Sequence, residues 1–257
     1  MAARKYFEEE LELVECDSFK KVAKALHQGQ SEYGIMAIEN TLAGSLLPNY
    51  ALIQKYGFYV VGEVYLHIKM NLMANEGVAL SDIKEVLSHP VALAQCDDFL
   101  ESRDDVELVE YHDTAAAAKW VKETGSKEVA AISNDLSAEL YGLNILSESI
   151  ETHKENFTRF LLLSKDPREV PNANKASLSL EVSHTPGSLA DVLLAFKNKQ
   201  VNLTKIQSVP IIGKPYQYAF KIDLTWESYS NYKSSVKEVE SLGTQVKVLG
   251  EYRAGSY

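Results

Sequence analysis

Cysteine is nearly absent from the chain, which has only Cys16 and Cys96 among its 257 residues. Two thiols do not make the disulfide framework of a small secreted domain, and their spacing fits no metal-binding motif. The sequence also lacks an apolar run of the roughly 18 residues that a membrane-spanning helix needs. Its start is polar and acidic where a signal peptide would be apolar. We therefore expect a cytoplasmic protein with no membrane partner.

Positive charge is also scarce. Lys and Arg number 26 against 36 Asp and Glu, which gives a formal net charge of −10. A protein that binds nucleic-acid phosphates needs a basic face, so the composition argues against a nucleic-acid partner. The length and the 46 % share of hydrophobic residues are those of a soluble globular protein with room for more than one core. We expect two or three modules.

The sequence lacks the motifs that mark many cofactor enzymes. It contains no Gly-rich phosphate loop, no dinucleotide-binding fingerprint, no nucleophile elbow and no paired-His metal motif. Any chemistry should therefore run without a metal or a nucleotide, and we expect no cofactor. The functional residues should be polar side chains at strand ends, where open α/β sheets bind their ligands.

Strand-like and helix-like patterns alternate through the first 165 residues. The expected strands are 11–16, 33–38, 58–68, 85–87, 106–111, 129–133, 145–150 and 160–163. The expected helices follow Asp17 and Ser18, follow Gly44 and Ser45, begin at Pro90 with Ser88 as the cap, and span 115–123 and 136–141. This alternation predicts a largely parallel α/β sheet with helices on both faces.

The alternation stops at residues 165–175, which hold two prolines and two asparagines but show no apolar periodicity. We interpret this stretch as a linker and place the linker at 169–175. The segments that follow are a strand at 176–182, a helix at 187–197, strands at 201–206 and 216–224, a helix at 229–242 and a strand at 245–249. Their order, βαββαβ, predicts a ferredoxin-like domain at 176–257.

Three polar clusters lie next to buried strands: IENTLAGS at 38–45, SHPVALAQC at 88–96 and NFTRF at 156–160. The first offers hydrogen-bond donors ahead of a helix, which suits a small carboxylate ligand. In the third, the guanidinium of Arg159 suits a carboxylate because it binds in bidentate fashion. Each cluster also has a structural explanation: a strand-to-helix turn, a Ser-x-Pro helix start with a structural His89, and an Arg in a salt bridge.

Taken together and in order, these clusters resemble the prephenate dehydratase family. The stretch AAISNDLSAELYGL at 130–143 adds to the resemblance, and HTPGSLADVL at 184–193 and LTKIQSVP at 203–210 resemble motifs of an ACT regulatory domain. The resemblance implies a two-lobed α/β dehydratase domain at 1–168, similar to type II periplasmic binding proteins, with its active site in the cleft between the lobes. Lobe I would comprise about 1–70 and 158–168 and lobe II about 71–157, with the ACT domain at 176–257.

The same resemblance implies roles for particular residues. The catalytic positions would be Glu39, Asn40, Ser88, Gln95 and Thr158. The substrate-binding positions would be Thr41, Gly44, Ser45, Arg159 and Phe160. The effector phenylalanine would bind at Pro186, Gly187, Ser188, Leu189, Gln207 and Ser208. The partners would be prephenate, phenylalanine and further copies of the chain, because ACT domains pair, so that a homodimer or homotetramer is expected.

The implied reaction converts prephenate to phenylpyruvate, CO₂ and water, and aromatisation of the ring supplies its driving force. Thr158 would donate a hydrogen bond to the leaving hydroxyl, because a threonine hydroxyl is too weak an acid to favour full proton transfer. Backbone N–H groups after Asn40 and around Ser45, together with Arg159, would hold the substrate carboxylates.

Two features depart from the family pattern. Residues 1–7 align with the helix that follows a Gly-rich loop in the family, so we expect the family's first strand and that loop to be missing, with weakened stability and impaired catalysis as the result. In the C-terminal motifs, Gly187-Ser188-Leu189 stands where Gly-Ala-Leu is common, and Gln207-Ser208-Val209-Pro210 stands where Glu-Ser-Arg-Pro is usual. The expected effector site therefore lacks the ionic contact of that arginine.

Two alternative functions stay open. Arogenate carries an amine where prephenate carries a keto group, and no residue in the sequence discriminates between the two substrates. The two-lobed fold also serves solute binding, so a catalytically impaired protein that only binds a small carboxylate or an amino acid is the second alternative. The NFTRF motif argues against simple capture. We interpret Cys96 as a small buried hydrophobe and not as a nucleophile.

Overall fold

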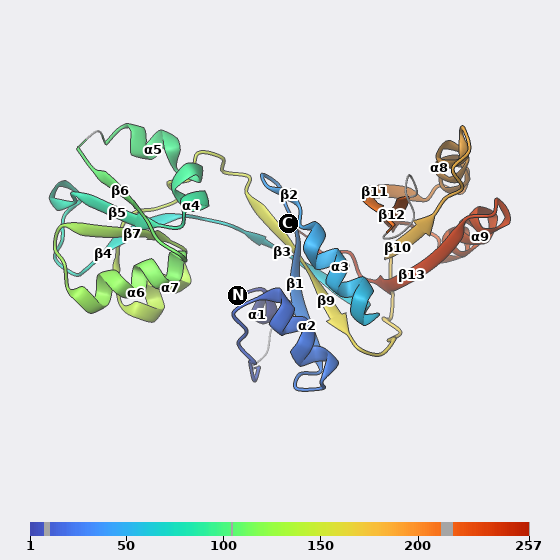
Figure 1. Cartoon of the computed structure of the whole chain (residues 1–257), viewed down its shortest axis with the longest axis horizontal. Helices are drawn as coiled ribbons and strands as arrows, with labels where there is room; N and C mark the ends of the chain where they lie inside the picture. Colours follow the sequence, from blue (N-terminus) through green and yellow to red (C-terminus); the bar gives the residue numbers. More distant parts are fainter. Residues whose placement is uncertain (8–10, 104, 212–217, 257) are drawn as a thin grey trace. The chain divides into compact units, whose positions relative to one another are not determined.

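The computed structural model describes residues 1–7, 11–103, 105–211 and 218–256. The chain divides into two units (Figure 1). Unit 1 comprises His67–Phe157 with Met1, and unit 2 comprises Ala2–Leu66 and Thr158–Tyr257. The chain therefore returns to unit 2 between Phe157 and Thr158, inside the NFTRF motif. None of the helices in the described part of the chain is long and apolar enough to cross a membrane.

A mixed five-stranded sheet forms the middle of unit 1, in the order β6-β5-β7-β4-β8. Its strands are β4 (Asn71–Ala74), β5 (Glu85–Ser88), β6 (Glu107–Glu110), β7 (Val129–Ser133) and β8 (Asn144–Ser147). β5 runs parallel to β6 and β7, whereas β4 is antiparallel to β7 and β8. β7 is buried along its whole length, as a central strand covered on both faces must be.

Helices cover both faces of this sheet (Figure 1). They are η1 (Leu80–Asp82), α4 (Pro90–Gln95), α5 (Asp97–Glu101), α6 (Thr114–Thr124) and α7 (Asp135–Tyr141). One face buries Leu93 and Leu100, and the other buries Ala117 and Val121. Alternate residues of β7 join the two clusters, as the two-residue period of a strand requires. The prediction of helices on both faces is confirmed for unit 1.

The first part of unit 2 is a four-stranded sheet in the order β2-β1-β9-β3. Its strands are β1 (Tyr33–Asn40), β2 (Gly44–Ser45), β3 (Tyr59–His67) and β9 (Phe157–Ser164), and its helices are α1 (Ala2–Phe7), α2 (Phe19–His27) and α3 (Leu47–Tyr56). β1 is antiparallel to both β2 and β9. The prediction of a largely parallel sheet is wrong here, because β9 reaches this sheet from unit 1 and not through a helical crossover from its neighbour.

The local sequence explains α2. The side chain of Ser18 accepts the backbone N–H of Lys21 and so caps the helix. Ala23 and Leu26 are buried on the helix face that meets the sheet. Gly29 follows the helix with a φ of 72°, a left-handed conformation that glycine adopts without strain. The predicted start of this helix after Asp17 and Ser18 is confirmed.

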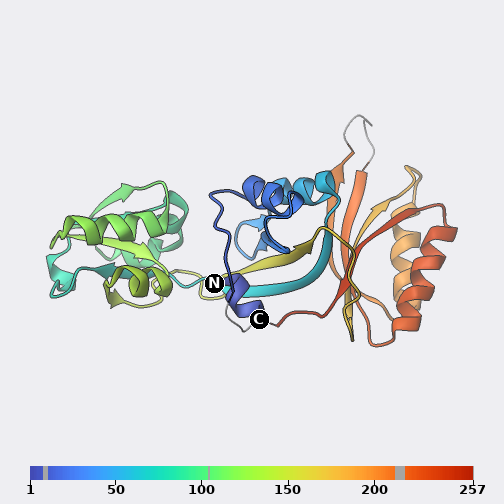
Figure 2. The same cartoon turned by 90° about the horizontal axis from the view of Figure 1, so that it is seen from below.

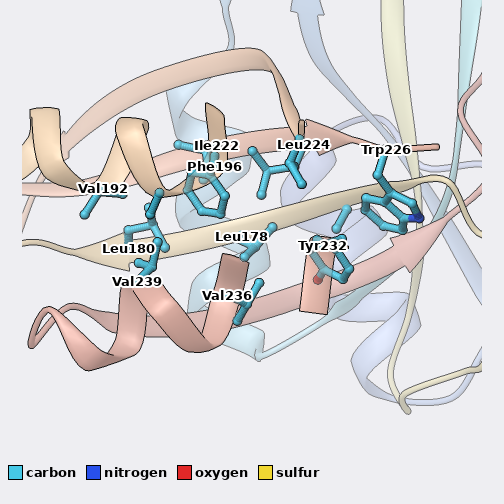
Figure 3. Close-up of a cluster of buried hydrophobic side chains, with 13 residues drawn as sticks. Leu178, Leu180, Val192, Phe196, Ile222, Leu224, Trp226, Tyr232, Val236 and Val239 are labelled. Atoms are coloured by element: carbon cyan, nitrogen blue, oxygen red, sulfur yellow. The ribbon is translucent and has the colours of Figure 1, made fainter. Parts of the chain in front are cut away.

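The second part of unit 2, which we call the C-terminal domain, has the predicted βαββαβ order. Its elements are β10 (Lys175–Glu181), α8 (Ser188–Asn198), β11 (Asn202–Pro210), β12 (Tyr218–Thr225), α9 (Tyr229–Ser241) and β13 (Gln245–Tyr252). The sheet order is β11-β12-β10-β13 with antiparallel neighbours. α8 and α9 cover one face of this sheet (Figure 2). Figure 3 shows the core between them, where Phe196 of α8 and Val239 of α9 pack over strand residues such as Leu178.

The other face of the C-terminal sheet is polar and packs against the first sheet of unit 2. Along β10, Leu178 and Leu180 belong to the helix-covered core. Lys175 and Ser177 alternate with the core residues and point the opposite way, and Lys175 reaches Glu63 of β3. This alternation resembles that of a solvent-facing sheet, yet both polar side chains are buried.

Two local predictions differ from the structure, and one strand was missed. The segment 11–16 forms no strand, and Leu13 and Val14 in it are 46 % and 49 % exposed, because a short alternating run becomes a strand only where a neighbour pairs with it. Ser88 does not cap α4, because it lies inside β5; the cap is His89, whose Nδ1 accepts the N–H of Val91 at 3.2 Å. β4 was not predicted. Of the predicted strand 216–224, positions 216 and 217 lie outside the described residues.

Gly250 of β13 lies against the backbone of β3, since a Cβ added there would lie 1.8 Å from the carbonyl oxygen of Val60. We expect Gly250→Ala to lower the free energy of unfolding by about 1–3 kcal/mol, because the two strands must separate to make room. Urea unfolding followed by circular dichroism measures this. Lys247→Ala, at an exposed position of the same strand, is the control and should change the value by less than about 0.5 kcal/mol. Equal stability of the two variants would contradict the packing.

Candidate functional site

Strands β1 and β9 bring the first and third polar clusters together. Their register places Glu39 opposite Arg159 and Asn40 opposite Thr158, after an irregularity between Ala37 and Glu39. A bulge of this kind turns the side chains that follow it. Two motifs that lie 118 positions apart, measured from Asn40 to Thr158, therefore share one end of the sheet.

The Asn40 amide is hydrogen-bonded at both of its ends. Its Oδ1 accepts the backbone N–H groups of Leu42 and Ala43, each at 2.9 Å, and so closes an Asx turn. Its Nδ2 donates to Oγ1 of Thr158 at 3.0 Å. A hydroxyl that accepts one bond still carries its own hydrogen to donate. The N–H groups of Leu42 and Ala43 are thus held by Asn40, so they do not supply the carboxylate donors that we expected in this turn.

Glu39 faces a lysine from the C-terminal domain. Nζ of Lys205 lies 2.9 Å from Oε2 of Glu39 and donates to Oγ of Ser45 at 3.0 Å. Nη1 of Arg159 is more distant from Glu39, at 3.9 Å. Since the register of β1 and β2 places Ser45 opposite Glu39, a single ammonium group contacts both strands of this short hairpin.

Arg159 lies in a buried network of charges and is only 3 % exposed. Its Nε donates to Glu63 at 2.6 Å, its Nη1 donates to Asp223, and its Nη2 donates to the hydroxyl of Tyr252 at 3.1 Å. Burial opposes the charged form, but the nearby Asp223, Tyr252 and Glu63 outweigh it and hold the pKa of Arg159 above its usual value. The three nitrogens are therefore bound to protein groups, as the salt-bridge explanation of this motif predicts.

Two further cationic and polar side chains extend this network. Nζ of Lys175 donates to both oxygens of Glu63, at 2.8 and 2.9 Å, and Oγ of Ser177 donates to Asp223 at 2.5 Å. Burial and repulsion by Arg159 lower the pKa of Lys175. We call this network the ion cluster, and its members are Glu63, Arg159, Lys175, Ser177, Asp223 and Tyr252. Burying so many charges is tolerable only because each one has a partner.

Ser88 and Gln95 lie in unit 1. Ser88 is buried at the end of β5 and donates to the carbonyl of Ile132 at 2.7 Å. Gln95 ends α4, and its Oε1 accepts a hydrogen bond from Nδ2 of Asn156 at 3.4 Å. The NFTRF motif thus gives Asn156 to unit 1 and Thr158 to unit 2.

The other predicted substrate-binding residues lie on unit 2 close to the turn. Thr41 is exposed between β1 and β2, Gly44 is exposed at the start of β2, and Phe160 is half-buried on β9 opposite Ala37. Cys96, in unit 1, is fully buried, and burial raises the pKa of its thiol to about 12, so that it is protonated at neutral pH and no nucleophile. Among the described residues, no group of three or more His, Cys, Asp and Glu side chains is arranged to hold a metal ion.

The predicted effector residues lie on two segments of the C-terminal domain. Pro186 and Gly187 are exposed ahead of α8, where Gly187 has a φ of 86°. Ser188 and Leu189 line a cavity of about 130 Å³. Gln207 and Ser208 are neighbours on β11, so their side chains point to opposite faces of the sheet.

Sequence reasoning missed Glu63, Lys175, Lys205 and Asp223. The signal was present for two of them, since Glu63 and Asp223 are carboxylates inside strands that are otherwise buried and largely apolar. A buried charge is costly without a partner, so such residues mark a contact with another charged surface. The sequence does not say which charges pair, because the pairs come from separate sheets.

The family model and the most similar curated proteins name the same family. The prephenate dehydratase family model matches residues 1–168. An arogenate dehydratase/prephenate dehydratase of Arabidopsis thaliana is 34 % identical over 255 residues, covering 94 % of this chain and 66 % of its own length, so the chain spans just under two thirds of that relative. A prephenate dehydratase of Arthrobacter aurescens, solved in complex with L-Phe, has a TM-score of 0.80 at 27 % identity, covering 94 % of this chain and 81 % of that one. A structure titled GqqA, a quorum quenching acylase, has a TM-score of 0.86 at 30 % identity, covering 98 % and 93 %.

The burial of Arg159 gives a stability prediction. We expect Arg159→Met to lower the free energy of unfolding by about 3–5 kcal/mol, because Glu63 and Asp223 would then lack a buried cation. Chemical denaturation measures the loss. Arg168→Met is the matched control, since Arg168 pairs with the exposed Glu32 in the same unit and should contribute about 0–1 kcal/mol. A loss no larger than that of the control would show that the ion cluster does not stabilise the fold.

Proposed function

Because the chain belongs to the prephenate dehydratase family, we propose that it converts prephenate to phenylpyruvate, CO₂ and water. The observation that carries the proposal is the 3.0 Å hydrogen bond from Asn40 to Thr158. It joins two of the polar motifs at one end of a sheet, and both residues lie within the 1–168 match. A hydroxyl held in this way is suited to donate a hydrogen bond to a leaving oxygen.

In the proposed reaction, the main task of the protein is to orient the substrate and the groups that contact it. The ring carboxylate leaves as CO₂, its electron pair enters the ring, and the bond to the ring hydroxyl breaks, so that the oxygen leaves as hydroxide and takes a proton to form water. Aromatisation drives these changes. Thr158 stabilises the negative charge on the leaving oxygen by donating its hydroxyl hydrogen, while Asn40 fixes the position of that hydroxyl by donating to it.

The remaining assignments follow from the motifs, with Ser88 and Gln95 in unit 1 and the other residues in unit 2. Glu39, Ser88 and Gln95 complete the proposed catalytic set, and Thr41, Gly44, Ser45 and Phe160 the proposed substrate-binding set. Arg159 differs, because its nitrogens already contact Glu63, Asp223 and Tyr252. We assign it the role of holding β9, which carries Thr158, in place of the substrate contact that its motif implied.

The C-terminal domain supplies the proposed regulation. We assign 1–168 to the dehydratase domain, 169–175 to the linker and 176–257 to an ACT domain that binds phenylalanine. The βαββαβ order supports this assignment, as does the L-Phe in the Arthrobacter aurescens relative. Pairing of ACT domains would give a homodimer or homotetramer, and we propose a cytoplasmic location.

Arogenate is the second candidate substrate. The Arabidopsis thaliana relative is named for both activities, and its identity of 34 % to this chain favours neither. The turnover assay is therefore run with both compounds. Acylase activity is assayed beside them, because the structure described as a quorum quenching acylase matches nearly the whole chain. Binding without turnover of any of these compounds would favour a non-catalytic protein.

Substitution of Thr158 tests the proposed chemistry. We expect Thr158→Ala to lower kcat for prephenate by about 10²–10³-fold, because the hydrogen bond to the leaving oxygen is lost, with a smaller change in KM. Thr158→Ser keeps the hydroxyl and should retain most of the activity. Phenylpyruvate formation followed by absorbance measures both.

The control for this series is Thr124→Ala, which removes an exposed threonine hydroxyl at the end of α6 in unit 1. It should turn over prephenate like the parent. Turnover by Thr158→Ala at the parental rate would remove Thr158 from the mechanism. No turnover of prephenate or arogenate by the parent protein would overturn the proposed function.

Calorimetry with phenylalanine tests the effector site. We expect Gly187→Ala to weaken phenylalanine binding at least about tenfold, because the left-handed φ of 86° disfavours any residue with a Cβ and the loop ahead of α8 must shift. Gly243→Ala is the matched control, since Gly243 has a φ of 80°, lies in the same domain and also has open space around its Cα. Equal affinities of the two variants would remove Gly187 from the site.

A further inference from the structure

Lys205 lies on β11 of the C-terminal domain, but its charged side chain contacts the first sheet of unit 2. β11 pairs with β12, and the register shifts between Leu203 and Lys205. Leu203 contacts the helix-covered core, whereas Lys205 lies opposite Asp223, a member of the ion cluster on the other face. The irregularity at Thr204 therefore turns Lys205 away from the core of its own domain and towards the first sheet of unit 2.

The contacts of Lys205 are all with elements of the first sheet and with α3. Its ammonium lies 2.9 Å from Glu39 and 3.0 Å from Oγ of Ser45, and it stands 5.4 Å from the centre of the Tyr50 ring. The side chain is only 6 % exposed. A lysine buried to this extent costs free energy unless it is paired, so the pairing with Glu39 holds β11 against the turn.

The turn also has bonds of its own: Oδ1 of Asn40 accepts the N–H groups of Leu42 and Ala43 within it, and the N–H of Leu46 donates to the carbonyl of Ile38 at 2.9 Å. β2 consists of two residues, which pair with Glu39 and Asn40. Lys205 contacts Glu39 on one strand of this hairpin and Ser45 on the other. Asn40, the residue that donates to Thr158, lies between them in the chain.

We infer that Lys205 is a positioning residue for the dehydratase reaction, which it serves from the C-terminal domain by holding the 39–45 turn in the geometry that orients Asn40 and Thr158. This inference rests on the proposed function. Lys205 itself does not contact the substrate, because its ammonium is buried on protein oxygens. Its effect on the reaction passes through Glu39 and Ser45.

Through Lys205, the C-terminal domain contributes to the geometry of the dehydratase site. Gln207 and Ser208, which belong to the proposed effector residues, follow Lys205 on the same strand. A displacement of β11 would therefore be transmitted to the turn through one side chain. The domain has a role in catalysis even without an effector.

The test compares Lys205→Met, Lys205→Arg and Lys247→Met in the full chain. Lys205→Met should lower kcat for prephenate about 10- to 100-fold with a smaller change in KM, because a displaced turn misplaces the reacting groups. Lys205→Arg, which keeps the charge, should recover part of the loss. Lys247→Met makes the same change at an exposed position of the same sheet and should behave like the parent.

A second readout does not depend on turnover. Hydrogen–deuterium exchange of the peptide that spans 39–45 should be faster in Lys205→Met than in the parent and unchanged in Lys247→Met. If Lys205→Met does not fold, the same two measurements on Lys205→Arg replace it, since the larger guanidinium weakens the contacts with Glu39 and Ser45 while it keeps the charge.

The outcomes separate the inference from the proposed function. Parental kcat in Lys205→Met, or parental exchange of the 39–45 peptide, overturns the inference while prephenate turnover by the parent leaves the function standing. If the parent turns over neither prephenate nor arogenate, the proposed function fails, and the role of Lys205 as a positioning residue for that reaction fails with it.

Discussion

The buried contact of Arg159 with Glu63 and Asp223 is the interaction on which the arrangement of unit 2 depends. Arg159 lies on β9, Glu63 on β3 and Asp223 on β12, so one guanidinium joins two strands of the first sheet to the C-terminal sheet. Charges at this depth are tolerated only while every partner is in place, so the contact fixes the position of the strands more strictly than an apolar contact would. Arg159, which follows Thr158 on β9, is thus held by a domain that begins only at Lys175. The position of Thr158 therefore depends on both parts of the unit.

The sequence predicts the elements of this unit well and their contacts poorly. Helix α2 and the βαββαβ order follow from capping residues and from apolar periodicity, which act over a few neighbouring positions. The antiparallel course of β9 does not, because it depends on where the chain goes while it forms unit 1. β10 shows the limit most clearly. Its alternation predicts one buried and one exposed face, but a polar face against solvent and a polar face against a second charged sheet have the same pattern.

For the candidate site too, the sequence predicts the residues well and their contacts poorly. The motifs identify Asn40 and Thr158 as polar residues at strand ends, and the resemblance gives them roles, but their hydrogen bond arises from a register that spans 118 positions. Arg159 is the instructive case, because its bidentate chemistry suits a substrate carboxylate and a protein carboxylate equally well. Only the depth of burial separates the two, and burial depends on Asp223 and Tyr252 of the C-terminal domain. Lys205 belongs to a motif that suggests regulation, yet its ammonium lies on the turn at 39–45.

The acidic charge of the chain bears on how the proposed site would hold the proposed substrate, which has two carboxylates. Of the cations around β1 and β9 in the described part of the chain, Arg159, Lys175 and Lys205 each contact a protein carboxylate. Thr41 and Ser45, which we propose as substrate-binding residues, are neutral and would contribute hydroxyl groups in place of a cation. Neutral donors recognise a carboxylate by geometry and attract it less over distance than cations do.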